Sequence, residues 1–511
     1  MAVGLLANYG GKAVVALLTV IALPILYQQL NSEGFGLFGF FYSLLALITL
    51  FDFGLSSAAQ RDLAAMGGAN GHANRMGLMR QCIHSLELPV IAVALAFCIC
   101  VTGFSEGLAT GWLRPRSLST GEVAWSIRWM VLAASGQLLA TYYASCLNGL
   151  SQFKWVNGIQ TSFALLRFAA MLTVAGWLVP NDHPLADRVM QVFAVWAVAN
   201  LTMAGALRMV LLRNFRGLAE KPRMDPAYLR RAFDFGLSVA GVTLLIMVFN
   251  QVDKFAASRT LNLAELGHYS MIWSLADVLY LFYFPIYTSF LPLLAARAAD
   301  DTPAGLPESI QLAWDCMALA VVPAAVSLLV LPDYAIWAWT GDAELGSNWG
   351  YLLAIAMAAA TFNAFLFVAF AVQQVSNRLR IWVRCVVLAL VVYLPVSICA
   401  VVWFGAPGGI IGWSAGTICL ASVLMVVCFS DQKYAGIRGA LVLSALRTIA
   451  SCVSVALVIR VLMPQAGNRW AALATLAVVA CTLYIAAAIA QRRLSARIFN
   501  RLQHVPMLRG L

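Results

Sequence analysis

Long apolar blocks dominate the chain, and short polar stretches separate them. Ala13–Tyr27 and Leu88–Phe104 are two examples, and with their flanking residues such blocks can cross a hydrocarbon core of about 30 Å as helices. No stretch alternates between apolar and polar residues as the strands of a membrane barrel do. The pattern therefore predicts an all-α polytopic membrane protein.

We expect about fourteen transmembrane helices from these blocks, with boundaries good to a few residues. The expected spans lie near residues 9–30, 36–59, 82–104, 126–147, 157–180, 188–212, 237–257, 266–291, 311–332, 349–372, 382–404, 408–430, 445–464 and 470–490. Composition agrees, because a chain with 62% hydrophobic and 11% charged residues cannot cover a soluble surface of ordinary polarity.

The distribution of lysine and arginine predicts the orientation, since these residues stay on the cytoplasmic side. With the N-terminus inside, 23 of the 33 Lys and Arg residues fall in cytoplasmic segments and six fall outside. Both termini are therefore predicted to be cytoplasmic. The net charge of +11 follows from this topology and from anionic membrane lipids, so no nucleic-acid partner is expected.

Residues that commonly carry chemistry are scattered. The eleven cysteines show no disulfide or metal-ligand pattern, and the five histidines make no pair at helical spacing. No GxxxxGK[ST] phosphate loop occurs. We therefore expect no metal, no cofactor and no ATP-driven mechanism within this chain.

The chain contains two sequence matches with itself, and only one of them indicates an internal repeat. The hexapeptide FDFGLS occurs at Phe51–Ser56 and Phe233–Ser238, but the flanking residues disagree, so the match indicates a shared environment at the same membrane face. An offset of 231 residues instead aligns Leu30–Ala65 with Leu261–Ala296 without a gap, and more than a quarter of the positions are identical. This repeat pairs the first two spans with the seventh and eighth.

The repeat predicts the domain organisation. An even number of spans separates the copies, so both run the same way through the membrane as a parallel repeat. We expect six-helix lobes at residues 1–212 and 233–430, joined by a basic cytoplasmic linker at 213–232. Residues 431–511 are expected to form two extra helices and a basic cytoplasmic tail.

Several segments together resemble the polysaccharide-transporter, or Wzx-type O-antigen flippase, family of the multidrug, oligosaccharidyl-lipid and polysaccharide exporter superfamily. They are LNSEGFGLFGF, NQVDKF, LAELGHYSMIWSL, FPIYTSFLPLLA and IWAWTGD. The chain departs from the family at Gln28 and Gln29, where members often carry an arginine before the first outer loop. A cation at that place is therefore in doubt.

The resemblance implies a non-enzymatic exporter of the bacterial inner membrane. The substrate would be an undecaprenyl-diphosphate-linked oligosaccharide, an O-antigen or exopolysaccharide repeat unit, moved by alternating access. Its implied partners are that lipid-linked oligosaccharide, membrane lipids and a polysaccharide polymerase with other export components. A sugar headgroup needs a wet path because each of its polar groups costs several kcal/mol in hydrocarbon.

Charged residues inside spans are the candidates for substrate binding, because each costs about 2.5 to 3.5 kcal/mol at mid-helix and tends to face a cavity or a partner. Arg167 lies near the middle of the fifth span. Asp277 lies near the middle of the eighth, on a mildly polar face with Ser274. Asp253 and Lys254 lie toward the outer end of the seventh.

Lys12, near the inner end of the first span, and Asn250, in the seventh, complete the candidate set. In the functional interpretation the cations bind the diphosphate, and Asp277 is a gate or an ion-coupled carboxylate. In the alternative interpretation, Arg167 and Asp277 form a static interhelical pair, and the charges near span ends extend to the membrane surface.

Two other functions compete with the flippase. A small-molecule or drug antiporter of the same fold would differ in cavity size and portal width, which the sequence does not give. A membrane-embedded glycan polymerase or ligase would be expected to carry a large outer loop with Arg and His. The expected outer loops, near residues 105–125 and 332–349, are short, and the second has no basic residue.

Overall fold

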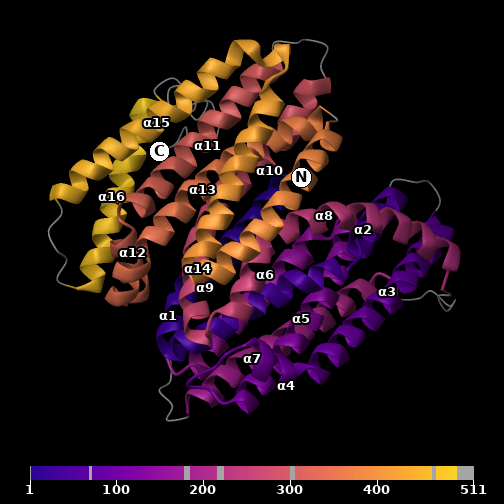
Figure 1. Ribbon diagram of the computed structural model, residues 1–511. Helices are drawn as coiled ribbons and strands as arrows, with labels where there is room; N and C mark the ends of the chain where they lie inside the picture. Colours follow the sequence, from indigo (N-terminus) through magenta and orange to yellow (C-terminus); the bar gives the residue numbers. More distant parts are fainter. Residues whose placement is uncertain are drawn as a thin grey trace, which may run out of the picture. The chain divides into compact units, whose positions relative to one another are not determined.

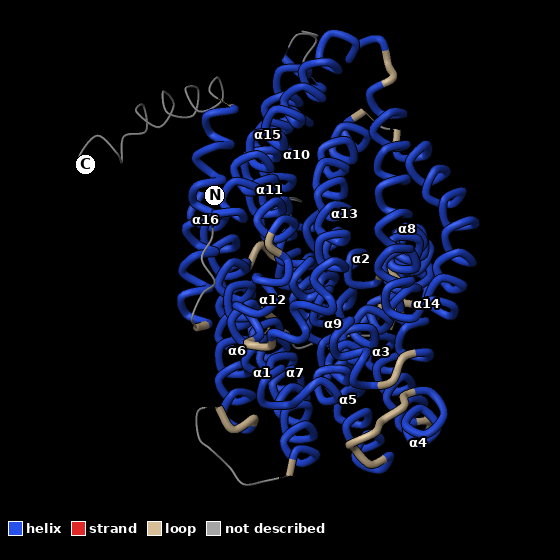
Figure 2. Tube along the Cα trace, turned by 60° about the vertical axis from the view of Figure 1, so that its left-hand side comes forward, coloured by secondary structure: helices blue, strands red, loops and turns tan. Residues whose placement is uncertain are grey.

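The computed structural model describes residues 2–67, 72–177, 184–215, 224–299, 305–376, 378–462 and 468–491. Every regular element in these ranges is a helix (Figures 1 and 2). The chain forms two compact units, an N-terminal unit of Met1–Ser270 and a C-terminal unit of Met271–Leu511. The all-α prediction is confirmed.

The N-terminal unit is built around α5, which packs against α1, α2, α3 and α7. Helix α8 packs against α1, α2 and α3 of the same unit. Its elements are α1 Ala2–Leu50, α2 Leu55–Gly67, α3 His72–Gly103, α4 Ser105–Gly107, η1 Leu108–Trp112, α5 Thr120–Gly149, α6 Phe153–Val174, α7 Leu185–Arg213, α8 Pro226–Thr260 and the first part of α9 Leu263–Ala276.

The C-terminal unit has α13 and α11 at its centre, and α15 and α16 pack against α11. Its elements after α9 are η2 Asp277–Leu279, α10 Tyr280–Ala299, α11 Gly305–Val330, α12 Pro332–Thr340, α13 Ala343–Val375, α14 Leu379–Phe429, η3 Gln432–Tyr434, α15 Ala435–Leu462 and α16 Arg469–Ala490. The two extra helices expected after residue 430 are thus present as α15 and α16.

The number of spans agrees with the prediction. Among the described residues, ten helices are long and apolar enough to cross a membrane. Two of these contain two spans each, because α1 breaks at Asn31 (φ 59°) and α14 at Gly405 (φ 63°). Helices α6 and α8 supply two further segments of membrane length, which brings the total to fourteen. Asparagine and glycine tolerate a positive φ better than other residues.

Side chains mark where several helices begin and end. Ser119, Asp225, Asp342 and Asn468 accept hydrogen bonds from the first backbone N–H groups of α5, α8, α13 and α16. The segment IWAWTGD ends α12 at Gly341 (φ 82°) and starts α13 at the adjacent aspartate. Its Gly-Asp pair therefore has a structural role as a helix stop followed by a helix start.

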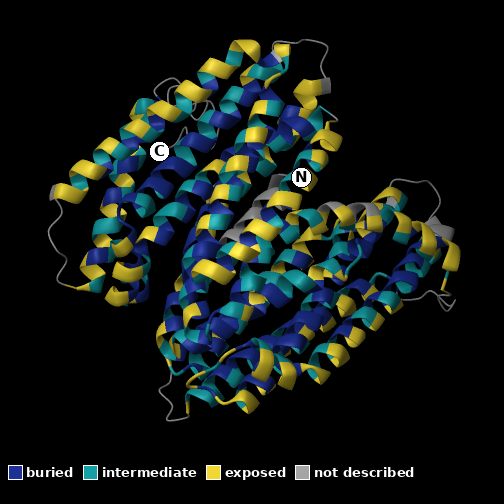
Figure 3. Cartoon of the chain, viewed as in Figure 1, coloured by how far each residue is buried: buried dark blue, intermediate teal, exposed yellow. Residues whose placement is uncertain are grey.

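Large apolar side chains cover the outside of the helices. Val461 is 84% exposed, and Trp403 and Trp470 are each 75% exposed. Figure 3 shows exposed positions along the whole length of α15 and α16. Such surfaces aggregate in water but are stable against lipid, so they support the membrane assignment.

The internal repeat is visible as a reciprocal contact. The 231-residue offset pairs Ser32 with Leu263 and Gly36 with Gly267. A Cβ added to Gly36 would lie 2.1 Å from the carbonyl oxygen of Leu263, and one added to Gly267 would lie 1.9 Å from that of Ser32. The glycine of each copy therefore packs against the equivalent carbonyl group of the other copy. Such a reciprocal contact is what a twofold axis between the two segments produces.

An aromatic pair repeats the same relation. Tyr42 of α1 meets Trp196 of α7 with ring centroids 6.0 Å apart, and Trp273 of α9 meets Trp413 of α14 at 4.5 Å. Both pairs are edge-to-face at 86°, and Tyr42 and Trp273 occupy equivalent positions of the repeat. The repeat is thus reflected in an equivalent aromatic contact within each unit. The lobe boundaries stay a prediction, because the expected linker includes residues 216–223, which lie outside the described ranges.

The predicted second span, 36–59, is shorter in the structure. Helix α1 ends at Leu50, and Phe53 (φ 47°) and Gly54 (φ 71°) turn the chain before α2 begins. The side-chain carboxylate of Asp52 accepts hydrogen bonds from the backbone N and the hydroxyl of Ser56, which caps the new helix. Hydropathy alone does not detect this break because the turn residues are themselves mostly apolar.

The two FDFGLS copies contact each other. Gly54 and Gly236 occupy the same position in the hexapeptide, and a Cβ on Gly54 would lie 2.4 Å from the carbonyl oxygen of Gly236. The rings of Phe53 and Phe233 stack with centroids 5.9 Å apart. The first copy forms a turn and the second lies inside α8, so they occupy the same end of the bundle in non-equivalent settings. Following the predicted orientation, we call this the inner end and the Asn31 end the outer end.

A buried carboxylate ties two segments together at the outer end. Glu33, 5% exposed, accepts hydrogen bonds from the backbone N atoms of Arg116 (2.8 Å), Ser117 (3.0 Å) and Leu118 (3.1 Å), and from the Ser117 hydroxyl (2.7 Å). Four hydrogen bonds from one short segment thus meet on this side chain. The segment before α5 is therefore anchored to the start of the second span.

Replacing Glu33 with glutamine is expected to lower the free energy of unfolding by about 1.5 to 3 kcal/mol, because one acceptor oxygen becomes an N–H donor facing other donors. Thermal unfolding followed by tryptophan fluorescence in detergent measures the change. The matched control is Glu106→Gln, whose carboxylate makes an exposed pair with Arg128 and should change stability by under about 1 kcal/mol. Equal shifts for both variants would contradict the anchoring role.

Candidate functional site

Arg167 lies near the middle of α6 and points its guanidinium at α7. Its Nη1 donates to the Oδ1 of Asn200 at 3.3 Å, and its guanidinium carbon lies 4.5 Å from the ring centroid of Trp196. Asn200 is 1% exposed and donates its own Nδ2 to the carbonyl oxygen of Ala133 at 2.9 Å. That bond leaves the amide oxygen of Asn200 as the acceptor that orients Arg167.

Arg167 is held by neutral groups and not by an opposite charge. Among the described residues no carboxylate lies within 4.0 Å of its nitrogens, and its buried Nε has no hydrogen-bond partner. A mid-span cation without a counter-charge is costly and is retained where it meets water or an anion. The alternative pairing with Asp277 stays a prediction, because Asp277 belongs to the C-terminal unit.

The three candidates on α8 lie within about one helical turn of one another. Asp253 is fully buried and accepts a hydrogen bond from the hydroxyl of Tyr269, while its Oδ1 has no partner among the described residues. The Nζ of Lys254 donates to the carbonyl oxygen of Asn250 at 2.8 Å, and the Asn250 amide donates to Ile246 at 2.9 Å. These side chains are engaged with their own unit, and none of them contacts Arg167.

The candidates of the eighth span lie on a broken helix. Ser274 is half-buried on α9, and Asp277 is exposed at the start of η2, a single 3₁₀ turn that separates α9 from α10. Short 3₁₀ stretches inside long helices often mark hinges. Lys12 lies in α1, but its side chain is outside the part that the structure describes.

The N-terminal unit contains a cavity of about 220 Å³ at its inner end. Its wall comes from the end of α1, the start of α2, α5 and α8. Gln137, Thr141 and Ser145 line it from α5 at a spacing of four residues, with Asp52 and Thr243 among the other lining residues. Sequence reasoning missed this site, although three polar residues on one face of an apolar helix were a usable signal.

Asp52 is the acidic group of that cavity. It lies just beyond the apolar span Leu17–Leu50. Burial raises the pKa of the Asp52 carboxyl above its ordinary value, and the hydrogen bonds from Ser56 oppose the rise. The group is therefore a weaker acid than a solvated aspartate.

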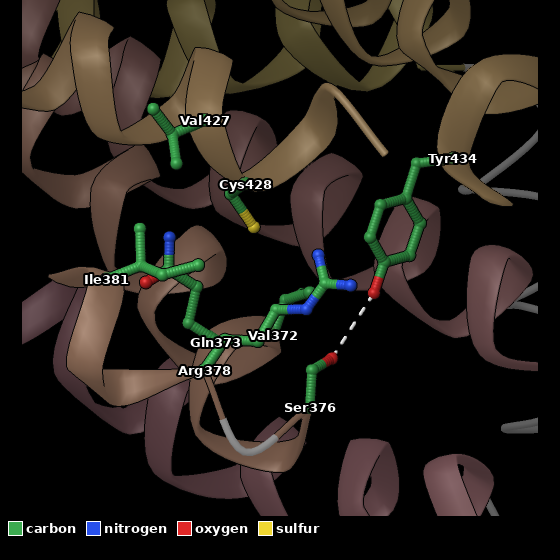
Figure 4. Close-up of a pocket in the computed structure, with 8 residues that line it drawn as sticks. All are labelled: Val372, Gln373, Ser376, Arg378, Ile381, Val427, Cys428 and Tyr434. Carbon is green, nitrogen blue, oxygen red and sulfur yellow. Dashed lines mark hydrogen bonds between the residues drawn. The ribbon is translucent and has the colours of Figure 1, made fainter. Parts of the chain in front are cut away.

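A second cavity lies at the end of α13 in the C-terminal unit (Figure 4). Its volume of about 20 Å³ is enough for about one water molecule. Arg378 points toward it and pairs with Asp431 at 2.9 Å, and the hydroxyls of Ser376 and Tyr434 lie 3.4 Å apart on one side. This site joins α13 to the segment before α15 and is too small for a transported substrate.

A family model described as polysaccharide biosynthesis protein matches residues 3–297, more than half of the chain. The chain belongs to the polysaccharide biosynthesis protein family. The matched residues span nearly all of the N-terminal unit. They therefore include Arg167, the α8 candidates and the cavity near Asp52. No curated protein sequence matches this chain.

Solved structures show which fold this family member has. The lipid II flippase MurJ in an inward closed conformation is similar with a TM-score of 0.68 and 12% identity, covering 97% of this chain and 100% of that one. An inward-facing multidrug resistance MATE transporter of the MOP superfamily gives 0.60 at 12% identity, covering 81% and 97%. The MATE multidrug transporter DinF-BH gives 0.56 at 12% identity, covering 84% and 94%. At this identity the likeness shows the fold alone, and it agrees with the all-α membrane fold predicted from the sequence.

Proposed function

We propose that this protein is a flippase that moves an undecaprenyl-diphosphate-linked oligosaccharide from the inner to the outer leaflet of the bacterial cytoplasmic membrane. The family and the fold support transport of a lipid-linked or amphipathic substrate. The O-antigen or exopolysaccharide repeat unit is the cargo that the polysaccharide family favours. A polysaccharide polymerase is the expected consumer of the product.

Arg167 is the observation that carries this proposal. A diphosphate must lose part of its hydration inside the membrane, and a guanidinium offers fixed donors that replace it. Asn200 and Trp196 orient Arg167 without neutralising it, so its charge stays available to an anion. A cationic drug would be repelled by the same group.

Alternating access in a bundle of two lobes fits this cargo. The sugar headgroup requires a polar path, while the prenyl tail stays in lipid. Asp277, Lys12, Lys254, Asp253, Asn250 and Ser274 remain candidates for this path or its gating. Both termini are proposed to be cytoplasmic, with the basic linker and tail against anionic lipid.

Deletion of the gene tests the function in cells. We expect lipid-linked oligosaccharide to accumulate and surface polysaccharide to disappear, with recovery when the gene is supplied again. A drug antiporter would instead leave surface polysaccharide intact and alter the efflux of a cationic dye such as ethidium. Loss of a membrane-embedded polymerase would leave single repeat units on the outer leaflet. Loss of a flippase leaves them on the inner leaflet.

A further inference from the structure

Hydroxyl groups from several helices line the cavity at the inner end of the N-terminal unit, set in a wall that is otherwise largely apolar. Thr141 and Ser145 of α5, Thr49 of α1 and Thr243 of α8 line it, together with the amide of Gln137. The Thr141 hydroxyl donates to the backbone oxygen of Gln137 at 2.9 Å and accepts from the Gln137 side-chain amide at 3.5 Å, which leaves one of its lone pairs as an acceptor. Hydroxyls set in an apolar wall suit an occupant that carries hydroxyls on an apolar ring.

The charge of the wall limits what this occupant is. Asp52 is the charged residue of the cavity, and neither lysine nor arginine lines it among the described residues. A diphosphate would meet a carboxylate without any compensating cation, so the anionic part of a lipid-linked substrate does not fit here. A group without charge that carries several hydrogen-bond donors fits both the hydroxyls and the carboxylate.

The size of the cavity limits it further. A volume of about 220 Å³ holds several water molecules. A space of this size admits one pyranose ring with its hydroxyls.

We propose that this cavity binds one uncharged sugar ring of the lipid-linked headgroup as the headgroup enters from the inner end. The proposal rests on the proposed function. Arg167 binds the diphosphate of the substrate, and the hydroxyl groups of α5 bind its sugar. The wall thereby adds selectivity for a glycosylated lipid over the bare carrier lipid.

Binding of lipids to the purified full-length protein in detergent tests whether the diphosphate and the sugar have separate sites. The probes are undecaprenyl diphosphate and the same lipid bearing one glucose, galactose or N-acetylglucosamine. The test variant Thr141→Val/Ser145→Ala removes two hydroxyls with little change of shape. The control is Thr202→Val, whose exposed hydroxyl bonds to Val198 of its own helix.

We expect the unaltered protein to bind at least one glycosylated lipid about tenfold more tightly than undecaprenyl diphosphate. The double variant should lose about tenfold in affinity for that glycosylated lipid, as expected for two lost hydrogen bonds, and keep its affinity for undecaprenyl diphosphate. Thr202→Val should bind both lipids as the unaltered protein does.

Several results would overturn the proposal. Equal affinity of the unaltered protein for bare and glycosylated lipids would remove the sugar site and leave the proposed function intact. Equal losses for both lipids in the double variant would show that the wall is structural only. A change confined to the sodium dependence of binding would identify a cation site. If neither lipid bound the unaltered protein, the proposed function itself would fail.

Discussion

Replacing Arg167 with alanine is expected to abolish surface polysaccharide while the protein remains in the membrane. The guanidinium can supply two charge-assisted hydrogen bonds to a diphosphate, and each such bond contributes about 1.5 to 3 kcal/mol. Their loss should lower export at least about a hundredfold. Arg167→Lys keeps the charge but not the planar fork of donors, so it should restore export only in part.

The matched control for this experiment is Arg128→Ala. The Arg128 guanidinium carbon lies 4.6 Å from the ring centroid of Trp125, much as that of Arg167 lies 4.5 Å from Trp196. Arg128 also pairs with Glu106 at 3.1 Å at the outer end. Arg128→Ala should leave export near normal, and the membrane content of all three variants is checked by immunoblot. Normal export by Arg167→Ala would remove Arg167 from the mechanism.

A second large effect on stability is expected at the reciprocal glycine contact. Gly36→Ala and Gly267→Ala would each place a methyl group within 2.1 Å of a backbone oxygen, so the helices must separate. Overpacking of this kind costs about 1 to 3 kcal/mol. Because the two glycines support one interface, the double variant should cost less than the sum of the single variants.

Gly205→Ala is the control for the glycine variants. Gly205 lies inside α7 with open space around the position of a Cβ, so alanine should be neutral or stabilising by up to about 1 kcal/mol. Thermal unfolding of the purified proteins measures all four variants. Equal behaviour of Gly36→Ala and Gly205→Ala would show that the close contact is not part of the stable fold.

The spans and the repeat could be predicted from the sequence because their signals extend over many residues. Hydropathy predicts each span from about twenty positions, and the 231-residue offset is supported along Leu30–Ala65. The break after Leu50 could not be predicted in this way, since two residues with positive φ determine it. The contact between the FDFGLS copies is equally hidden, because it joins residues 182 positions apart in different local structures.

The candidate site could be predicted only in part. A lone cation in an apolar segment is visible in the sequence, which makes Arg167 a candidate. Asn200 and Trp196 of α7 were not, because amides and aromatic residues are common in spans and only packing brings them to Arg167. The role of Glu33 could not be predicted for a similar reason. It binds backbone N–H groups, which nearly every residue type provides.

Transport in proteoliposomes tests the central claim most directly. The protein is reconstituted with a fluorescent undecaprenyl-diphosphate-linked oligosaccharide, and the lipid that reaches the opposite leaflet is quantified with an impermeant quencher or glycosidase. We predict that the unaltered protein speeds this movement at least about a hundredfold over both protein-free vesicles and Arg167→Ala. We further predict that a potential negative on the side of departure accelerates it, because about 2.3 kcal/mol per charge is gained for each 100 mV. Movement of the lipid-linked oligosaccharide no faster than in protein-free vesicles, in preparations that transport ethidium, would contradict the account.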